Sequence, residues 1–237
     1  MKNSLVKKLA VGISLVSAMA ITSMANAAVA PFNATYNFNI EGKYNGTASR
    51  VLTQTGNQYF YNVNASVGKL ASAKQTANFV NANGAILPVR ALTQYKILGT
   101  GRTTTLNFNN AKKQLVTNYK GQNKVIALPQ PAYDDLSLEI QIREDLKAGK
   151  FRGKYYMADR NTVEAVPFKK SAMTRITVPA GTFDVVRIDR VHDDKDRQTS
   201  FWLAPKLDYL PVKVVQNNDG RKMEMNLARV NQYFVMF

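Results

Sequence analysis

From residue 32 onwards, apolar and polar side chains alternate in short segments separated by turns, and this pattern constrains the fold more than any other feature. In residues 32–41 every second side chain is apolar, and those between are Asn, Thr and Glu. Successive side chains of a strand point to opposite faces of a sheet, so the period of two predicts a strand buried on one face. A turn over 42–46 leads into 47–54 and 59–67, which complete a predicted β-meander.

The same alternation continues to the end of the chain. Residues 178–214, which hold the only Trp and the only His, form three consecutive antiparallel strands by this criterion. Further strands are predicted for residues 76–80, 89–98, 103–108, 114–119, 125–128, 154–159, 163–168, 171–178 and 222–230. Roughly a dozen strands at spacings of about 8–12 residues indicate an all-β domain with a single curved antiparallel sheet, a barrel or half-barrel like those of lipid carriers. A sandwich is the alternative.

One segment, residues 129–147, has the period of a helix instead. Asp134 or Asp135 is placed to cap its N-terminus, and Gly149 follows its end. Its apolar residues recur at helical spacing: Leu136, Leu138, Ile140, Ile142 and Leu146. Glu139 and Arg143 form a pair four residues apart, for which a stabilisation of only a few tenths of a kcal/mol is expected. We expect this one main α-helix to cover one opening or one face of the sheet.

The first residues predict export. Three lysines precede an apolar run over 9–24, and Ala25-Asn26-Ala27 fits the small-x-small pattern of a signal-peptidase site. Residues 1–27 are therefore predicted to be a signal peptide and 28–237 a single β-rich exported domain. A cut after Ala30 also fits the pattern, but it would place Pro31 first in the exported chain. The apolar run is short for a membrane span, which needs about 20 residues, and no second run follows it.

Composition narrows the compartment and the partners. The chain has no Cys, which excludes disulfides, thiolate metal sites and a lipidated cysteine, so the exported protein is not a lipoprotein. The formal net charge is +16, of which three lysines of the predicted signal peptide contribute three, leaving +13 for the exported domain. In the periplasm the available polyanions are lipids and cell-wall polymers, so an envelope lipid or an anionic polymer is the expected partner and nucleic acid is not. A basic surface with no dedicated partner is the alternative.

Several ordered segments resemble a known family. They are Asp135-Leu136-Ser137 with its helix, Val178-Pro179-Ala180-Gly181-Thr182-Phe183, Phe201-Trp202-Leu203-Ala204-Pro205 and Tyr209-Leu210-Pro211-Val212, after an opening Phe32-x-Ala34-x-Tyr36 strand. Together they resemble the bacterial exported family known as domain of unknown function 3108. The resemblance implies a periplasmic β-rich domain, and it implies no activity, ligand or catalytic residue.

No residue pattern predicts catalysis, a cofactor or a metal site. His192 is the sole imidazole, and its acidic neighbours in 189–196 lack the glycine turn and distal carboxylate of a calcium loop. There is no Gly-x-Ser-x-Gly elbow, so a hydrolase is the least favoured class. Trp202 is a weak candidate for ligand binding: it either anchors the core or forms part of an apolar wall facing a ligand.

The sequence thus favours a non-catalytic periplasmic envelope protein. Its expected ligand is amphiphilic or anionic, with acyl chains held by the concave sheet and head groups met by Lys and Arg at the rim. The competing hypothesis is a scaffold with a filled core that docks on an envelope protein or a cell-wall polymer. Whether the interior of the sheet is hollow or filled distinguishes the two.

Overall fold

The structure is a computed structural model that describes residues 29–128 and 130–232. The predicted signal peptide, residues 1–27, lies outside this range. In the described part, none of the helices is long and apolar enough to cross a membrane. The strands are β1 (Phe32–Ile40), β2 (Tyr44–Thr55), β3 (Gln58–Val67), β4 (Ala71–Ala82), β5 (Ala85–Ile97), β6 (Thr100–Asn109), β7 (Gln114–Tyr119), β8 (Gln122–Ala127), β9 (Ala132–Tyr133), β10 (Lys154–Ala158), β11 (Val163–Val178), β12 (Gly181–Arg190), β13 (Arg197–Ala204), β14 (Leu210–Asn218) and β15 (Arg221–Gln232).

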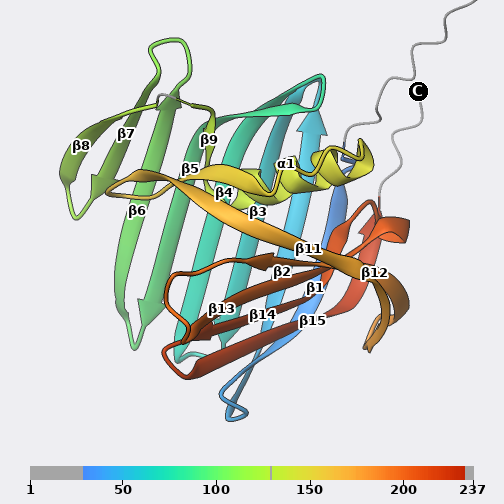
Figure 1. The fold of residues 1–237 in the computed structure, drawn as a ribbon. Helices are drawn as coiled ribbons and strands as arrows, with labels where there is room; N and C mark the ends of the chain where they lie inside the picture. Colours follow the sequence, from blue (N-terminus) through green and yellow to red (C-terminus); the bar gives the residue numbers. More distant parts are fainter. Residues whose placement is uncertain (1–28, 129, 233–237) are drawn as a thin grey trace, which may run out of the picture.

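These strands form one continuous sheet in the order β8-β7-β6-β5-β4-β3-β2-β1-β15-β14-β13-β12-β11-β10-β9. Every neighbouring pair is antiparallel except β9 and β10, which are parallel. The sheet curls so that β11–β15 lie opposite the broad wall of β1–β6 (Figure 1). Because the two end strands, β8 and β9, do not pair with each other, the curved sheet remains unclosed. The prediction of a single curved antiparallel sheet with one main helix is confirmed.

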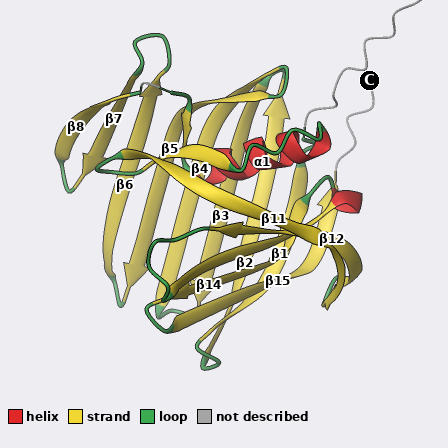
Figure 2. Ribbon diagram, viewed as in Figure 1, coloured by secondary structure: helices red, strands yellow, loops and turns green. Residues whose placement is uncertain are grey.

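Helix α1 (Asp135–Lys147) crosses the strands on the inner side of the curl (Figure 2). Its apolar residues are buried against the inner face of the sheet, as the helical spacing predicted. The carboxylate of Asp134 caps the N-terminus by accepting hydrogen bonds from the backbone N–H groups of Leu136 and Ser137, at 3.0 and 3.2 Å. A short 3₁₀ helix, η1 (Pro205–Leu207), joins β13 to β14.

The predicted helical segment 129–147 is too long at its start, because the helix begins only after the predicted cap, Asp134. Ala132 and Tyr133 form strand β9 and pair with Tyr156 and Met157 of β10. This pairing, together with Pro131, which disfavours helical backbone at residue 130, keeps the chain extended up to the Asp134 cap. The two strands predicted over 163–168 and 171–178 are likewise one long strand, β11, whose register shifts between Lys170 and Met173.

The core lies on the inner face of the sheet. Phe32, Leu52, Tyr61 and Ala77 occupy one cross-strand row of β1–β4, and all four are fully buried. The next residues along each strand point outward and are mostly polar. The period of two in the sequence therefore corresponds to an apolar interior and a hydrophilic exterior.

Candidate functional site

The inner side of the curl is hollow. A cavity of about 320 Å³ lies between β1–β4, α1 and the strands β10–β15 of the opposite wall. This volume is at the lower end of the range of small-molecule sites, about 300–1,000 Å³. Most of the lining is apolar: Phe38, Ala48, Val63, Ala65, Ala73, Leu136, Leu138, Ile142, Met157, Phe168, Ile188, Phe201, Leu203, Val214, Met223 and Met225.

Small side chains on one wall create this space. Ala48, Ala65 and Ala73 are direct partners across β2, β3 and β4, so they form a row of methyl groups on the inner face. The opposite wall carries larger side chains, among them Phe168 and Phe201. On β1 the row continues with Tyr36, whose hydroxyl donates to the backbone oxygen of Pro211 in β14 at 2.8 Å. Beside this tyrosine only methyl groups project from the alanine row, which leaves space between the two walls. The interior is therefore hollow at the level of this row.

One buried arginine lies on the cavity wall. Arg50 of β2 is 5% exposed and belongs to the cross-strand row next to the alanine row, on the side of α1. Its Nη2 donates to Oε2 of Glu139 of α1 in a close ion pair. Its Nε and Nη1 atoms are buried and have no hydrogen-bond partner in the protein. The guanidinium also lies over the rings of Tyr36 and Tyr61, 5.7 and 5.3 Å from their centroids.

The carboxylate of Glu139 is shared among three groups. Besides Arg50, it accepts a 3.0 Å hydrogen bond from the hydroxyl of Tyr61 and lies 3.9 Å from Nη1 of Arg143. Arg143 is completely buried, and its Nε donates to the backbone oxygen of Asp208 at 2.9 Å. One carboxylate thus faces two guanidinium groups at the centre of the fold.

Burial fixes the ionisation of this cluster. Burial raises the pKa of Tyr36 to about 12 and that of Tyr61 well above its usual value, so both phenols keep their protons. Burial, the largest single effect, would lower the pKa of Arg50, but the charge and hydrogen bond of Glu139 together with the neighbouring Tyr61 and Tyr36 outweigh it and raise that pKa, so the guanidinium stays charged. The cavity therefore contains a permanent positive charge.

A second group of charged side chains lies at the C-terminal end of α1. Lys147 contacts Asp208 at 2.9 Å, and Nη2 of Arg143 lies 3.7 Å from the same carboxylate. Asp208 has a left-handed backbone with φ of 57°, which Asp tolerates better than most residues. The backbone N–H of Val29 donates to Oε1 of Glu144 at 2.6 Å, and that of Ala30 donates to Asp208 at 3.0 Å. These contacts fix the first described residues against the helix.

A neighbouring cavity of about 360 Å³ extends towards β5 and β6 and shares Gln75, Asp135, Leu136, Met157 and Arg190 with the first. It is polar, because Asp134, Asp159, Arg160 and Glu164 also line it. Burial raises the pKa of Asp134 to about 6 against the hydrogen bonds from Ser137. Asp135 borders both cavities, and its side chain is therefore accessible. Protein atoms nevertheless surround its carboxyl group, and this desolvation raises its pKa, although the nearby Arg190 acts to lower it.

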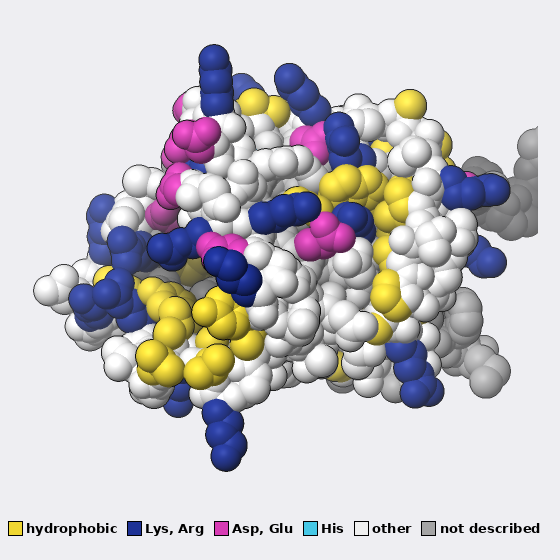
Figure 3. Space-filling model, turned by 90° about the horizontal axis from the view of Figure 1, so that it is seen from below, with side chains coloured by type: hydrophobic (Ala, Val, Ile, Leu, Met, Phe, Trp, Pro, Cys, Tyr) yellow, Lys and Arg dark blue, Asp and Glu magenta, His cyan; other side chains and the backbone are white. Residues whose placement is uncertain are grey.

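The end of the sheet away from α1 exposes apolar side chains. Leu70 in the β3–β4 turn, and Ile97 and Leu98 at the β5–β6 turn, are 50, 59 and 75% exposed. The two turns are joined by a 2.9 Å hydrogen bond from Leu98 N–H to the oxygen of Leu70. Lys69 and Lys96 flank them and are exposed. Seen from below, hydrophobic side chains gather on the surface beside Lys and Arg side chains (Figure 3).

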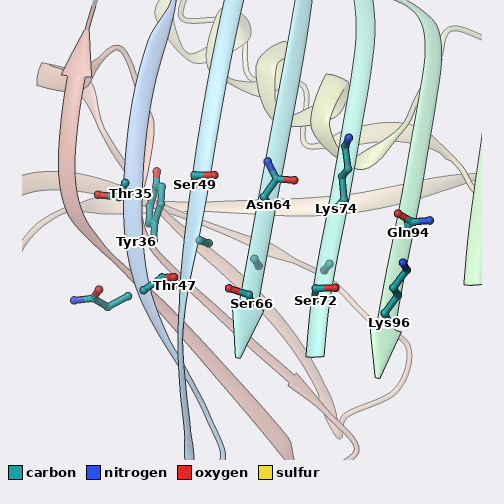
Figure 4. Close-up of a pocket in the computed structure, with 14 residues that line it drawn as sticks. Thr35, Tyr36, Thr47, Ser49, Asn64, Ser66, Ser72, Lys74, Gln94 and Lys96 are labelled. Atoms are coloured by element: carbon teal, nitrogen blue, oxygen red, sulfur yellow. The ribbon is translucent and has the colours of Figure 1, made fainter. Parts of the chain in front are cut away.

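The outer face of the same strands has a shallow polar groove of about 600 Å³. Figure 4 shows two rows of labelled side chains running across β1–β5. In each row the residues are direct partners on neighbouring strands: Thr35, Ser49, Asn64, Lys74 and Gln94 in one, Thr47, Ser66, Ser72 and Lys96 in the other. The side chains are short hydroxyls and amides except at the β4–β5 end. There the two lysines make the groove basic.

Trp202 does not line the apolar cavity. Its neighbours Phe201 and Leu203 do, and Trp202 points to the other face of β13. There its ring is half-buried between Lys213 and Arg187, with the cations 5.6 and 6.0 Å from the ring centroid. Its place in the structure is therefore that of a packing residue on the outer face.

His192 lies between β12 and β13, where Nε2 is 3.1 Å from the hydroxyl of Thr199. Burial and the nearby Arg190 lower its pKa. Over residues 29–128 and 130–232, no group of three or more His, Cys, Asp or Glu side chains could hold a metal ion.

The buried ion cluster was missed from the sequence. Glu139 and Arg143 were expected to form only a weak pair at helical spacing, but Arg143 is fully buried and Glu139 is nearly so. Arg50 carried a signal, because it stands between Ala48 and Leu52 in the apolar phase of its strand. A charged residue in that phase must be paired inside the fold or bind something there.

The comparisons with known proteins place the chain in a family. The family model described as "Protein of unknown function (DUF3108)" matches residues 31–226. The chain belongs to this family. Its fold is similar to that of a β-barrel-like protein of domain of unknown function DUF1849 from Brucella abortus, with a TM-score of 0.58 and 10% sequence identity, covering 87% of this chain and 99% of that one. No curated protein matches the sequence. At such low identity the similarity concerns the fold alone.

Proposed function

We propose that this protein is a non-catalytic envelope protein that binds an amphiphilic molecule by its acyl chain. The observation that carries the proposal is the apolar cavity of about 320 Å³ between the alanine row and α1. Interiors of proteins are normally close-packed, so a cavity of this size, lined by Phe, Met and Leu side chains, is suited to an apolar ligand. A scaffold with a filled core has no need of it.

The exposed apolar turns give the amphiphile a route to the cavity. Leu70, Ile97 and Leu98 lie in the turns at one end of β3–β5, the end that is farther from α1. Apolar side chains beside Lys69 and Lys96 have the composition of a surface that rests on anionic lipid head groups. This arrangement supports pick-up from a membrane surface or delivery to one.

Export to the periplasm is part of the proposal, with a cut after Ala27. Val29 is completely buried, and its N–H and that of Ala30 donate to Glu144 and Asp208. A cut after Ala30 would remove both anchors, so we expect the exported protein to begin at residue 28. Intact-mass measurement of protein purified from the periplasmic fraction checks this, and a mature chain beginning at residue 31 would contradict it.

The ligand proposal is tested by native mass spectrometry and lipid extraction from gently purified protein. We expect a bound amphiphile, and we expect Ala65→Leu to reduce its occupancy because the added atoms fill the cavity. Asn64→Leu is the matched control, since residue 64 points to the opposite face of the same strand. The proposal would be contradicted by a wild-type protein that carries no lipid and binds neither a fatty acid nor a lysophospholipid at low salt.

The outer groove supports a second candidate function. Its hydroxyl and amide side chains, with Lys74 and Lys96 at one end, suit an anionic cell-wall polymer laid across β1–β5. A scaffold that docks on such a polymer would use this face, and its inner cavity would bind no ligand. Binding of a purified anionic glycan to wild type and to Ala65→Leu with equal affinity, together with an empty cavity, would favour this function over the first.

A further inference from the structure

We propose that Arg50 binds the carboxylate head group of a single-chain amphiphile inside the cavity, so that the ligand lies head-inward with its chain towards the open end. This inference rests on the proposed function and reverses the orientation that a basic rim would favour. It is carried by the position of a charged, incompletely paired guanidinium on the wall of an apolar cavity.

Arg50 is incompletely paired. Its side chain is 6% exposed, one of its three nitrogens contacts Glu139, and Nε and Nη1 have no partner in the protein. A buried donor left without a partner destabilises the folded state, and more strongly when it is charged. Native folds rarely accept this cost unless another group satisfies the donor.

The carboxylates around Arg50 are shared with other cations or face them. Glu139 is the carboxylate in contact with Arg50, and it is shared with Arg143. The other carboxylates of the cluster, Asp208 and Glu144, face Arg143 and Lys147 at the far end of α1. Asp135, one helical turn before Glu139 on α1, borders the cavity near Arg190. A water molecule could satisfy the free donors of Arg50, but an anionic head group would form stronger, charge-assisted hydrogen bonds with them.

Arg50 lies at the end of the cavity that α1 covers. Arg50 belongs to the cross-strand row with Val63 and Gln75, one row nearer to α1 than the alanine row. Helix α1 covers this end through Glu139, whereas the exposed apolar turns lie at the other end. A head group at Arg50 is therefore deep, and the chain runs along the methyl groups of Ala48, Ala65 and Ala73.

The cavity volume limits the size of the head group. The volume of about 320 Å³ must hold both the head and part of the chain. A carboxylate is a compact anion, and it forms charge-assisted hydrogen bonds with guanidinium groups. A glycerophosphate head with two chains does not suit this space. The ligand class is accordingly a long-chain carboxylate.

The experiment compares palmitate with palmityl alcohol, which has the same chain and no charge, on the full exported chain after delipidation. A charge-assisted hydrogen bond contributes about 1.5–3 kcal/mol, so wild type should bind palmitate about 10- to 100-fold more tightly than the alcohol. In Arg50→Met the affinity for palmitate should fall to that for the alcohol, which itself should not change. Arg50→Lys should retain part of the preference. Arg221→Met, which removes an exposed arginine that lines neither cavity, is the matched control and should keep it. Arg190→Met and Lys69→Ala test the other cations on the cavity wall and at the exposed turns.

The outcomes separate the two proposals. If neither molecule binds wild type, the proposed function fails and this inference fails with it. If both bind equally, or if the preference for the acid survives in Arg50→Met, the cavity binds chains but Arg50 does not bind the head. Loss of the preference in Lys69→Ala or Arg190→Met instead would place the head elsewhere and overturn the assignment.

Should Arg50→Met fail to fold, a measurement on wild type still decides. Palmitate labelled with ¹³C at the carboxyl group reports its own titration by NMR. A carboxylate next to Arg50 should titrate at a lower pH than the same acid in detergent micelles. A bound carboxylate whose titration matches that in micelles would overturn the inference.

Discussion

The two faces of strands β1–β5 use charge in opposite ways. On the inner face, Arg50 is enclosed by the sheet and α1 and contacts a buried carboxylate. On the outer face, Lys74 and Lys96 extend into solvent at the end of a groove of hydroxyl and amide groups. The difference shows that an inner-face charge must be balanced by the fold or by a ligand, whereas water already solvates an outer-face charge.

The contrast between buried and exposed charges predicts that Glu139→Ala is severely destabilising. It would leave Arg50 and Arg143 buried without the carboxylate that they share, and breaking a buried pair costs about 3–5 kcal/mol. Urea denaturation should show this loss in the free energy of unfolding. The control is Asp184→Ala, which breaks the exposed ion pair with Arg175 between β11 and β12 and should not move the midpoint measurably. Equal effects of the two substitutions would remove the distinction between buried and exposed charges.

A second buried carboxylate predicts a pH dependence. The folded state raises the pKa of Asp134 from 3.8 to about 6, so between about pH 4 and 6 the folded chain binds more protons than the unfolded one. The contribution of Asp134 to the free energy of unfolding therefore falls as pH rises through this window. Asn caps helices as Asp does, so Asp134→Asn should remove the effect. Relative to wild type, the variant should gain on the order of 2–3 kcal/mol between pH 4 and 7.

Denaturation at several pH values measures this difference directly. Subtracting wild type from variant cancels the other groups whose pKa burial raises, such as Glu144. The matched control is Asp184→Asn, whose carboxyl has its pKa lowered by Arg175 and lies at the surface. A difference between Asp134→Asn and wild type that stays constant from pH 4 to 7 would contradict the assignment.

Strand alternation and helix periodicity were sufficient to predict a mostly antiparallel β fold with one main helix, whereas they left a sandwich open as the alternative to the curved sheet. Both are local patterns, and their physical cause is the direction of successive side chains. The helix start was mispredicted because a non-local contact, the pairing of Tyr133 with Met157, kept the chain extended. A short parallel bridge of this kind leaves no periodic trace in the sequence.

The site was less predictable than the fold. The hollow interior depends on the alignment of Ala48, Ala65 and Ala73 across three strands, and such a register is fixed by turns and packing rather than by any one segment. Likewise, Glu139 and Arg143 look like a surface pair until β2 places Arg50 against them. By contrast, the burial of Arg50 itself could have been inferred from its place in the apolar phase of β2.

A smaller loss is expected for Gly46→Ala, which tests packing at the edge of the cavity. A methyl group at residue 46 would overlap the ring of Phe38 and lie 2.5 Å from the backbone oxygen of Ser66. Overpacking of this kind costs about 1–3 kcal/mol. Thr47→Ala, the next residue and on the outer face, should cost less. A fully stable Gly46→Ala would mean that both the ring of Phe38 and the backbone at Ser66 can shift, and the cavity volume would then differ as well.

The smallest effect on stability is expected from removing the outer charges. The double variant with Lys74→Ala and Lys96→Ala should denature at the same urea concentration as wild type, because both side chains are exposed and solvated. Its affinity for an anionic polysaccharide, measured by isothermal titration at low and at moderate salt, should fall, and so should the salt dependence. Palmitate binding should be unaffected, since the lysines lie on the opposite face from Arg50. If the double variant instead lost palmitate and kept the polysaccharide, the roles of the two faces would be exchanged, and the head group would belong at the surface rather than beside the buried arginine.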